Sequence, residues 1–533
     1  MKRALPYFVI VAACVLAACT RNFDKINTDP AKSSATNFDP NYLFTNVAQN
    51  YANVSEFQLY ELSCMMQVFS STLDYYSGGD KYTTFLLSYN NRFFSDGLLG
   101  ASQLVELKSL ALQRDPAKYA NLVCMSDILF VLVMQRVTDV YGDVPYFQVG
   151  MAKQGIQLPA YDAQQDIYHN MLGKLDSAIT GLDAARPLAT GDLLYGGAID
   201  KWQRLGYSLM VRVAMRLSKA DPATAQLYVE KAAGKTFTGT ADDAIVKFDR
   251  GVNQYNQLAL DLPQVRWSQT FIDFLRAGND PRLYTLTEKP DTGLASNSRI
   301  RAAGLGYTTA SPAPAGYVQE VPVGMPNGYD IGGVHDIAAA PGYPGPTGSG
   351  TNASPLGNYA RPKVTVFGVQ VNVPVNILSY AQTELLLAEA AVRGWKAGGV
   401  SAAAHFKNGI TAALQSQAAI DPTLAIPADV ITAYGERHPL NTAVADSALK
   451  MINTQYWAAC LLDFAESWSN YRRSGYPALT PVLYPGNITN GAIPRRLTYP
   501  LSENALNHDQ YQAALQRMGG TDVNTARVWW DVP

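Results

Sequence analysis

Apolar residues recur every three or four positions along much of the chain, which is the spacing of one face of an α-helix. The clearest case covers residues 166–185, where Ile167, Met171 and Leu175 fall on one face. The same pattern predicts further helices. The full set of predicted helices is 42–60, 61–73, 93–114, 118–137, 166–185, 199–219, 383–393, 401–417 and 447–473.

Glycine pairs separate the predicted helices into hairpins. Gly-Gly occurs at 196–197 and at 398–399, each time just before a predicted helix. The run from Trp202 through Leu205 to Gly206 fits the opening W-x₂-L-G of the tetratricopeptide pattern, although later positions of that pattern fit poorly. In such a hairpin the Trp packs on the neighbouring helix and the Gly permits close approach. We therefore predict a mainly α fold with a tetratricopeptide-like helical-hairpin scaffold.

The periodicity disappears between about residues 288 and 376. This segment is rich in Gly, Pro, Ala and Ser, as at 311–316 and 341–346. That many helix breakers exclude a helix of ordinary length, although the alternating run 364–373 could form a small hairpin. A loop of this length inside a compact chain is usually functional or disordered. We predict one domain over 42–533, with an irregular, loop-rich second half built around this insert.

The amino-terminal residues have the pattern of an export signal. Lys2 and Arg3 precede an apolar run at 6–16, which is shorter than the roughly 20 residues needed to span a bilayer. The run ends in Leu-Ala-Ala-Cys, which resembles the bacterial lipobox. We expect residues 1–18 to be removed and Cys19 to carry acyl chains such as palmitate, because several chains together make a stable anchor. The alternative is an ordinary secretory signal with a chance cysteine.

Beyond the signal, composition narrows the classes of function. Residues 19–41 are polar and turn-rich, as expected of a tether, and we find no second apolar run long enough to cross a membrane. The net charge of −2 and the lack of a long Lys/Arg run give no reason to expect nucleic-acid binding. Cys64, Cys124 and Cys460 are widely spaced and odd in number, so we expect buried thiols, with no disulfide framework or metal knuckle.

No pattern of catalytic residues stands out. The five histidines are far apart in sequence, and the chain has no metalloprotease spacing, nucleophile elbow or phosphate-binding loop. We therefore predict no enzyme, no cofactor and no metal site. A pair of glycosidase carboxylates could still come from any part of the chain, so a surface glycosidase stays an alternative.

Aromatic residues are the better indication of function. The chain has 31 Tyr and 7 Trp, and a flat ring can stack on the apolar face of a sugar while polar neighbours bind its hydroxyls. We expect Trp202, Tyr456, Trp457 and Trp468 to be core residues, because they lie in predicted helices. The candidate ligand-binding residues outside helices are Tyr75, Tyr76, Asp80, Tyr82, Arg266, Trp267, Tyr307, Tyr317, Tyr329 and Tyr343.

Several short segments also carry local structural predictions. Gly142 and Pro145 should end the helix before them, since glycine accepts a positive φ and proline cannot continue a helix. Arg495 and Arg496 are expected to pair with buried carboxylates rather than with ligand. The Trp pair at 529–530 should hold the end of the chain against the core.

A set of segments in a fixed order gives the sequence a specific resemblance. The segments are Asn22-Phe-Asp-Lys-Ile-Asn-Thr-Asp-Pro30, Thr138-Asp-Val-Tyr-Gly-Asp-Val-Pro-Tyr146, Glu384-Leu-Leu-Leu-Ala-Glu-Ala390, Trp468-Ser-Asn-Tyr-Arg-Arg-Ser-Gly-Tyr-Pro477, Ile493-Pro-Arg-Arg-Leu-Thr-Tyr-Pro500 and Val528-Trp-Trp-Asp531. Together they cover nearly the whole chain. In this order they resemble the SusD/RagB family of surface lipoproteins.

The resemblance implies a SusD-like α/α superhelix and a function. It implies an outer-membrane, lipid-anchored protein, facing the cell exterior, that binds a nutrient oligosaccharide or peptide. It also implies a SusC-like TonB-dependent transporter as the partner that imports the ligand. Acidic residues often follow the lipidated cysteine in exported members, whereas Thr20 to Asn22 precede Asp24 here. A lipid-anchored tetratricopeptide-type scaffold that binds envelope proteins is a further alternative.

Overall fold

The computed structural model describes the chain except for residues 1–37, 54–56, 249–257, 289–321, 351–352 and 364–372. The predicted signal peptide, Cys19 and most of the tether lie outside the described residues. So do Tyr307, Tyr317 and nearly all of the alternating run 364–373.

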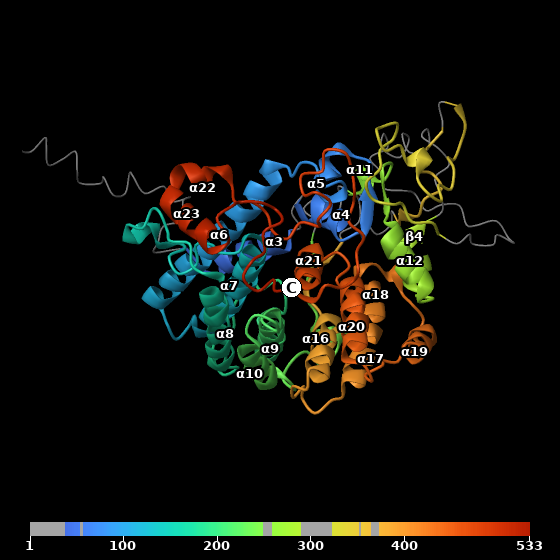
Figure 1. Cartoon of the computed structure of the whole chain (residues 1–533). Helices are drawn as coiled ribbons and strands as arrows, with labels where there is room; N and C mark the ends of the chain where they lie inside the picture. Colours follow the sequence, from blue (N-terminus) through green and yellow to red (C-terminus); the bar gives the residue numbers. More distant parts are fainter. Residues whose placement is uncertain (1–37, 54–56, 249–257, 289–321, 351–352, 364–372) are drawn as a thin grey trace, which may run out of the picture.

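Antiparallel helices packed side by side form the first half of the molecule (Figure 1). Neighbouring helices in the series α6–α7–α8–α9–α10 pack directly on one another, and α3 lies against α6. The helices are α3 (Asn41–Ala52), α6 (Leu87–Arg114), α7 (Ala120–Tyr141), α8 (Gln164–Gly181), α9 (Ile199–Arg216) and α10 (Pro222–Ala232).

A second group of helices continues the series, because α16 packs on α9 as well as on α17 and α20 (Figure 1). The longer helices here are α12 (Gln269–Ala277), α16 (Tyr380–Val392), α17 (Ala402–Gln415), α19 (Ala428–Arg437), α20 (Ala445–Ala459), α21 (Phe464–Ser474), α22 (Leu501–Leu506) and α23 (His508–Arg517). The chain is thus a helical superhelix of paired helices, as predicted.

Short elements fill the connections between helices. Within the described residues the strands form three antiparallel two-stranded sheets: β1 (Phe69–Ser71) with β3 (Val265–Trp267), β2 (Ala244–Val246) with β6 (Val375–Leu378), and β4 (Thr287–Glu288) with β5 (Arg361–Pro362). The short helices are η1 (Phe57–Leu62), α4 (Ser63–Met65), η2 (Asp74–Tyr76), α5 (Ser77–Asp80), η3 (Met151–Gln154), η4 (Thr240–Asp242), α11 (Leu258–Asp261), α13 (Arg282–Leu286), η6 (Ile337–Ala339), α18 (Gln417–Ile420) and η8 (Pro422–Leu424).

The α8–α9 hairpin has the packing that the tetratricopeptide-like pattern predicts. A Cβ added at Gly206 would lie 2.5 Å from Ile179 Cγ1 on α8, so only glycine allows this approach of the two helices. Trp202 is fully buried, and its indole N–H donates to Asp192 Oδ2 at 2.7 Å. Its ring lies 5.7 Å from that of Phe44 on α3, which ties the hairpin to the first helix.

The helix α7 is long and apolar enough to cross a membrane by length and composition alone, which corrects our sequence expectation. Of its most apolar window, 72% is buried inside the protein, as for a core helix. It ends at Tyr141, where Gly142 has a φ of +90°. This confirms the predicted helix end.

Three predicted helices end early or are broken in the structure. The predicted helix 42–60 ends at Ala52, and the separate short helix η1 begins at Phe57. Residues 61–73 are helical only to Met65, after which the chain enters strand β1. The predicted helix 447–473 is two helices, α20 and α21, with Leu462 at a φ of +72° between them. The segments 61–73 and 447–473 are mostly buried, and a pattern with little exposed surface gives little information about where a helix ends.

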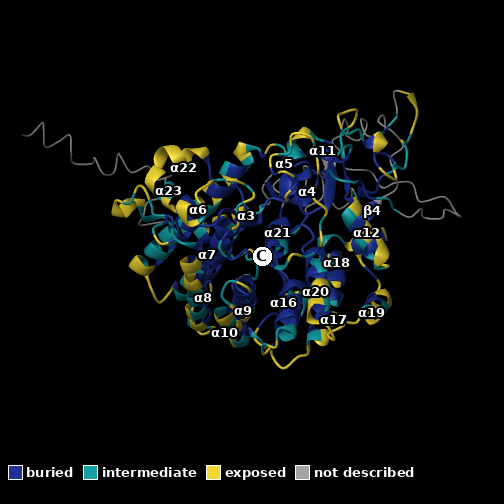
Figure 2. Cartoon of the chain, in the orientation of Figure 1, coloured by how far each residue is buried: buried dark blue, intermediate teal, exposed yellow. Residues whose placement is uncertain are grey.

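Buried ion pairs connect the two groups of helices through α21, which lies in the middle of the molecule (Figure 2). Arg216 on α9 pairs with Asp139 on α7 at 3.2 Å and with Glu466 on α21. Arg473 on α21 in turn pairs with Glu389 on α16 at 2.6 Å. These side chains are almost completely buried, so each charge depends on its partner.

The carboxy-terminal residues are held as the sequence predicted. Arg495 Nε donates to Asp531 Oδ2 at 2.7 Å, and Arg496 pairs with Asp522. Trp530 is fully buried, and the Arg472 guanidinium lies 4.7 Å from the centre of its ring. Cys64 and Cys460 are buried as expected, whereas Cys124 is only partly buried.

Candidate functional site

The predicted tyrosine loop is built around a buried aspartate. Asp80 accepts hydrogen bonds from Asn327 Nδ2 at 2.7 Å and from the Gly328 N–H at 2.8 Å. It also accepts from the Ser71 N–H at 3.2 Å. Burial raises the pKa of the Asp80 carboxyl above its ordinary value. One carboxylate therefore joins the segment after β1 to the described end of the loop-rich insert.

The predicted tyrosines of this loop face inwards. Tyr76 and Tyr82 are fully buried, and the Tyr76 hydroxyl donates to Asp261 Oδ2 at 3.0 Å. Tyr75 is half-buried, and its hydroxyl donates to the other oxygen of Asp261. Burial and the Asp261 charge both raise the pKa of the Tyr76 hydroxyl.

Arg266 and Trp267 lie in the short strand β3 and are also fully buried. Arg266 Nε donates to the Leu356 carbonyl at 3.0 Å, and the Trp267 indole donates to the Leu286 carbonyl at 3.1 Å. This corrects the sequence prediction. Five of the proposed ligand contacts are inside the protein and can only support the loops: Tyr76, Asp80, Tyr82, Arg266 and Trp267.

Next to these buried residues lie four partly exposed side chains and one buried lysine, which together we name the aromatic loop surface. Its members are Lys81, Tyr329, Asp330, His335 and Tyr484. The Tyr484 hydroxyl donates to Asp330 Oδ2 at 2.7 Å, and Lys81 Nζ lies 3.3 Å from Asp330 Oδ1. The His335 ring lies 5.4 Å from that of Tyr484 and 6.0 Å from that of Tyr329. Three rings thus form a row, and the Tyr484 ring at one end of the row is hydrogen-bonded to the Asp330 carboxylate.

Backbone hydrogen bonds hold the loop that carries this surface. The Asp330 N–H donates to the His335 carbonyl, and the Ile337 N–H donates to the Asp330 carbonyl, both at 2.8 Å. The tip between them, at 331–334, is exposed. Apolar side chains at this tip and on the neighbouring loop are open to solvent, namely Ile331, Val334, Leu483 and Ile488.

A buried neighbour holds the charged group of the aromatic loop surface in place. Lys81 is only 2% exposed, so it acts by holding the Asp330 carboxylate rather than by reaching a ligand. The hydrogen bond to Asp330 raises the pKa of the Tyr484 hydroxyl to about 12. The phenol therefore stays protonated, and the carboxylate keeps a free lone pair for a donor such as a sugar hydroxyl.

Of the predicted site residues that the structure describes, only Tyr329 belongs to this surface. Tyr343 is half-buried, and its hydroxyl donates to the Pro355 carbonyl at 2.7 Å, so it packs beneath its own loop. The sequence did not indicate Tyr484, because its loop reaches the surface from a distant part of the chain. Asn487 of that loop donates to the Lys81 carbonyl across 406 positions of sequence.

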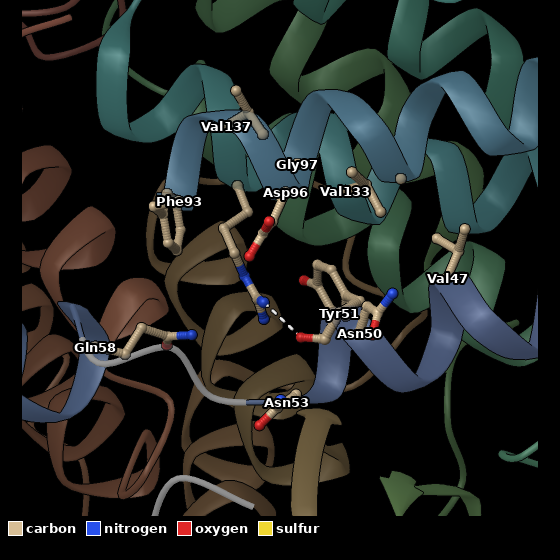
Figure 3. A pocket seen from close by; sticks show the side chains of 12 residues that line it. Val47, Asn50, Tyr51, Asn53, Gln58, Phe93, Asp96, Gly97, Val133 and Val137 are labelled. Atoms are coloured by element: carbon tan, nitrogen blue, oxygen red, sulfur yellow. Dashed lines mark hydrogen bonds between the residues drawn. The ribbon is translucent and has the colours of Figure 1, made fainter. Parts of the chain in front are cut away.

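A separate pocket lies between α3, α6 and α7 (Figure 3). Arg136 lies over the Tyr51 ring at 3.6 Å from its centre and donates to the Tyr51 carbonyl at 2.7 Å. The volume of this pocket is about 70 Å³. Since ligand pockets usually measure roughly 300–1,000 Å³, it is too small for a saccharide ring. Within the described residues no group of three or more His, Cys, Asp or Glu is placed to hold a metal ion.

The fold and this surface define a class of protein: a helical-repeat scaffold that carries a partly exposed aromatic surface on its loops. The comparison with known families agrees with this class. The chain belongs to the SusD-like family, whose model is described as "Starch-binding associating with outer membrane" and matches residues 31–500. The predicted family is therefore confirmed, and it is a family of carbohydrate-binding proteins associated with the outer membrane.

Solved structures of the family resemble nearly the whole chain. One described as a chitin-binding protein is 29% identical, with a TM-score of 0.76, and the match covers 93% of this chain and 100% of that one. A SusD-like protein described as Bacteroidetes AC2a is 24% identical, with a TM-score of 0.75 and the same coverage. A chitin-binding SusD homologue from Flavobacterium johnsoniae is 23% identical, with a TM-score of 0.70, over 92% and 98% of the two chains. Among curated proteins there is no significant match.

Proposed function

We propose that this protein is a lipid-anchored, cell-surface binding protein that captures oligosaccharides and delivers them to a TonB-dependent outer-membrane transporter. The observation that carries the proposal is the aromatic loop surface. Its tyrosine rings stack on the apolar faces of sugar rings, and the Asp330 carboxylate accepts hydrogen bonds from their hydroxyls. The role is capture, and the proposal assigns no catalysis to the chain.

The ligand class to test first is the β-linked N-acetylglucosamine oligomer. The structure at 29% identity is described as chitin-binding, and the similarity extends over nearly the whole of both chains. An acetamido group adds a planar amide with an apolar methyl and an N–H donor to the sugar, which suits a surface of aromatic rings beside a carboxylate. Other oligosaccharides and peptides are the comparison ligands in the same assay.

Replacing Tyr484 by Ala is expected to weaken binding of a chito-oligosaccharide about tenfold in Kd, since losing a central ring contact costs on the order of 1–2 kcal/mol. Isothermal titration of the purified protein measures this. Tyr42→Ala on α3 is the matched control, because that tyrosine is 67% exposed and outside the aromatic loop surface. Equal affinities of the Tyr484 variant and the unchanged protein would refute this position of the site.

Replacing Cys19 by Ser is expected to move the protein from the membrane fraction to the soluble fraction. A hydroxyl cannot take the thioether-linked lipid, and each buried CH₂ of an acyl chain contributes about 0.8 kcal/mol to membrane binding. Fractionation and mass spectrometry of the mature amino terminus measure the effect. An unmodified Cys19 in the unchanged protein would end the lipoprotein proposal.

Two further measurements distinguish the proposal from its alternatives. Co-purification of the membrane-extracted protein with a large β-barrel supports delivery to a transporter. Binding of envelope proteins without any glycan or peptide ligand would instead indicate a scaffold. Release of reducing sugar from polysaccharides would indicate a glycosidase.

A further inference from the structure

A second concave site lies on the α6–α8 side of the molecule, away from the aromatic loop surface (Figure 1). Its volume is about 390 Å³, within the usual range for a ligand pocket. We name it the α6–α8 cleft. Its lining residues used below come from α6 (Val105, Lys108, Leu112), α7 (Asp127, Phe130) and the loop after α7 (Tyr146, Phe147).

Among the described residues, the charged side chains that line the cleft are Lys108, Asp127 and, from α8, Lys174, which together carry a net charge of +1. Lys108 Nζ lies 2.7 Å from Asp127 Oδ2, and Lys174 Nζ lies 3.3 Å from Asp127 Oδ1. Two ammonium groups therefore share a single carboxylate. All three side chains are partly exposed, so an incoming anion can reach the ammonium groups.

The aromatic wall of the cleft is held rigidly. The backbone N–H groups of Tyr146 and Phe147 both donate to Asp162 Oδ2, at 2.9 and 2.8 Å. The Tyr146 hydroxyl donates to Asn170 Oδ1 at 3.0 Å, and its ring meets that of Phe130 edge-on at 5.4 Å. The backbone geometry of this wall is thus set before any ligand arrives.

The same loop is also fastened to α6. A Cβ at Gly150, which has a φ of +76°, would lie 3.1 Å from both Ser102 Cα and Val105 Cβ. A side chain at this position would not fit, so glycine is required where the loop passes close to α6. Apolar groups remain open at the rim, where Phe147 is 44% exposed and Leu112 is 49% exposed.

The length of the cleft along α6 fits a short extended peptide. Lining residues on α6 run from Leu104 to Leu112, a rise of about 12 Å at 1.5 Å per residue. That distance matches three to four residues of extended chain at about 3.3 Å each. Lys108 lies midway, with apolar residues on both sides of it. An anion is therefore expected at the centre of the bound segment, with an apolar side chain on each side.

We infer that the α6–α8 cleft binds an extended segment of a partner protein in which an acidic residue stands between large apolar residues. The partner's carboxylate pairs with Lys108 and Lys174, and its apolar side chains cover Leu112, Phe130 and Phe147. Because Lys108 and Lys174 share the single carboxylate of Asp127, their excess positive charge favours an acidic residue in the bound segment. This site does not depend on the aromatic loop surface or on the oligosaccharide proposal.

The test is titration of the full-length mature protein with the peptide acetyl-Leu-Asp-Leu-Phe-amide and with its Asn analogue. The Asp peptide is expected to bind about tenfold more tightly, because charge-assisted hydrogen bonds are stronger than neutral ones. Phe147→Ala should weaken both peptides, and Lys108→Gln should reduce the preference for Asp over Asn. Leu99→Ala, an exposed position on α6 outside the cleft, is the matched control.

Equal binding of the Asp and Asn peptides, or binding that Phe147→Ala leaves unchanged, would overturn the inference. Free 4-phenylbutyrate distinguishes the source of the anion. If it binds as tightly as the Asp peptide and with the same dependence on Lys108, the cleft takes a small organic acid and the peptide assignment is wrong. Circular dichroism of each variant checks that the helices are retained.

Discussion

Replacing Glu389 by Gln is expected to lower the free energy of unfolding by about 3–5 kcal/mol, the usual cost of breaking a buried ion pair. Glu389 is fully buried and accepts from Arg473 Nη1 at 2.6 Å and Nη2 at 2.7 Å. Arg393 donates to it at 2.8 Å and Asn453 at 3.0 Å. An amide accepts fewer of these bonds and leaves the Arg473 guanidinium buried without a charge partner.

The same contacts determine how the contribution of Glu389 to the free energy of unfolding depends on pH. Burial alone would raise the pKa of Glu389, but the neighbouring arginines hold it well below the ordinary value of 4.5. A carboxyl with a depressed pKa in the folded state stabilises the fold above its unfolded pKa. The contribution therefore decreases as the pH falls below about 4.5 and is absent from Glu389→Gln.

Urea denaturation at pH 7 measures the free energy of unfolding lost in Glu389→Gln. The control is Glu436→Gln at an exposed position on α19. The stability of this control is expected to lie within about 0.5 kcal/mol of that of the unchanged protein. The double variant Glu389→Met with Arg473→Met is expected to be less destabilised than Glu389→Gln. It removes both main charges and leaves no unpaired guanidinium at 473. A Glu389→Gln protein within 1 kcal/mol of the unchanged chain would contradict this account of the core.

Replacing Glu61 by Gln is expected to stabilise the protein at alkaline pH relative to acidic pH. Glu61 is fully buried, and burial raises its pKa from 4.5 to about 8, although the Leu86 N–H donates to it at 3.1 Å. Within the described chain its Oε2 has no hydrogen-bond partner. Added Cβ atoms at Gly78 and Gly79 would both collide with Glu61, so the following loop packs tightly on this residue.

The sign of the effect follows from proton binding. Between pH 4.5 and about 8 the folded state keeps a proton on Glu61 that the unfolded chain has lost. Stability therefore falls with rising pH across this interval, by an amount on the order of 4 kcal/mol, and becomes constant above it. Glutamine does not titrate, so Glu61→Gln removes this slope.

Urea denaturation of both proteins at pH 5, 7 and 9 measures the difference in free energy of unfolding. As the pH rises, the free energy of unfolding of the variant should increase relative to that of the unchanged protein. Burial also raises the pKa of Asp243 to about 7, so Asp243→Asn is measured alongside to separate its share of the slope. Parallel pH profiles for the Glu61 variant and the unchanged protein would show that Glu61 does not titrate in this range.

Local patterns in the sequence predicted the scaffold well. The tetratricopeptide-like opening placed Trp202 and Gly206 correctly, because a buried ring and a missing Cβ are needs of the helix pair itself. Gly142 ended α7 as expected for the same reason: a positive φ is a property of one residue. The pairing of Arg495 and Arg496 with carboxylates was also predictable, since a guanidinium beside short apolar runs has few other ways to be buried.

The sequence by itself determined the helical scaffold, the family and the loop-rich character of the second half. Only the tertiary structure decided which aromatic residues face solvent. Tyr82 and Trp267 lie in segments that look like exposed loops, yet their neighbours from distant parts of the chain bury them. Tyr484 and Lys81 meet because two loops far apart in sequence fold side by side. Burial depends on all the residues that pack around a side chain, and a local pattern contains only a few of them.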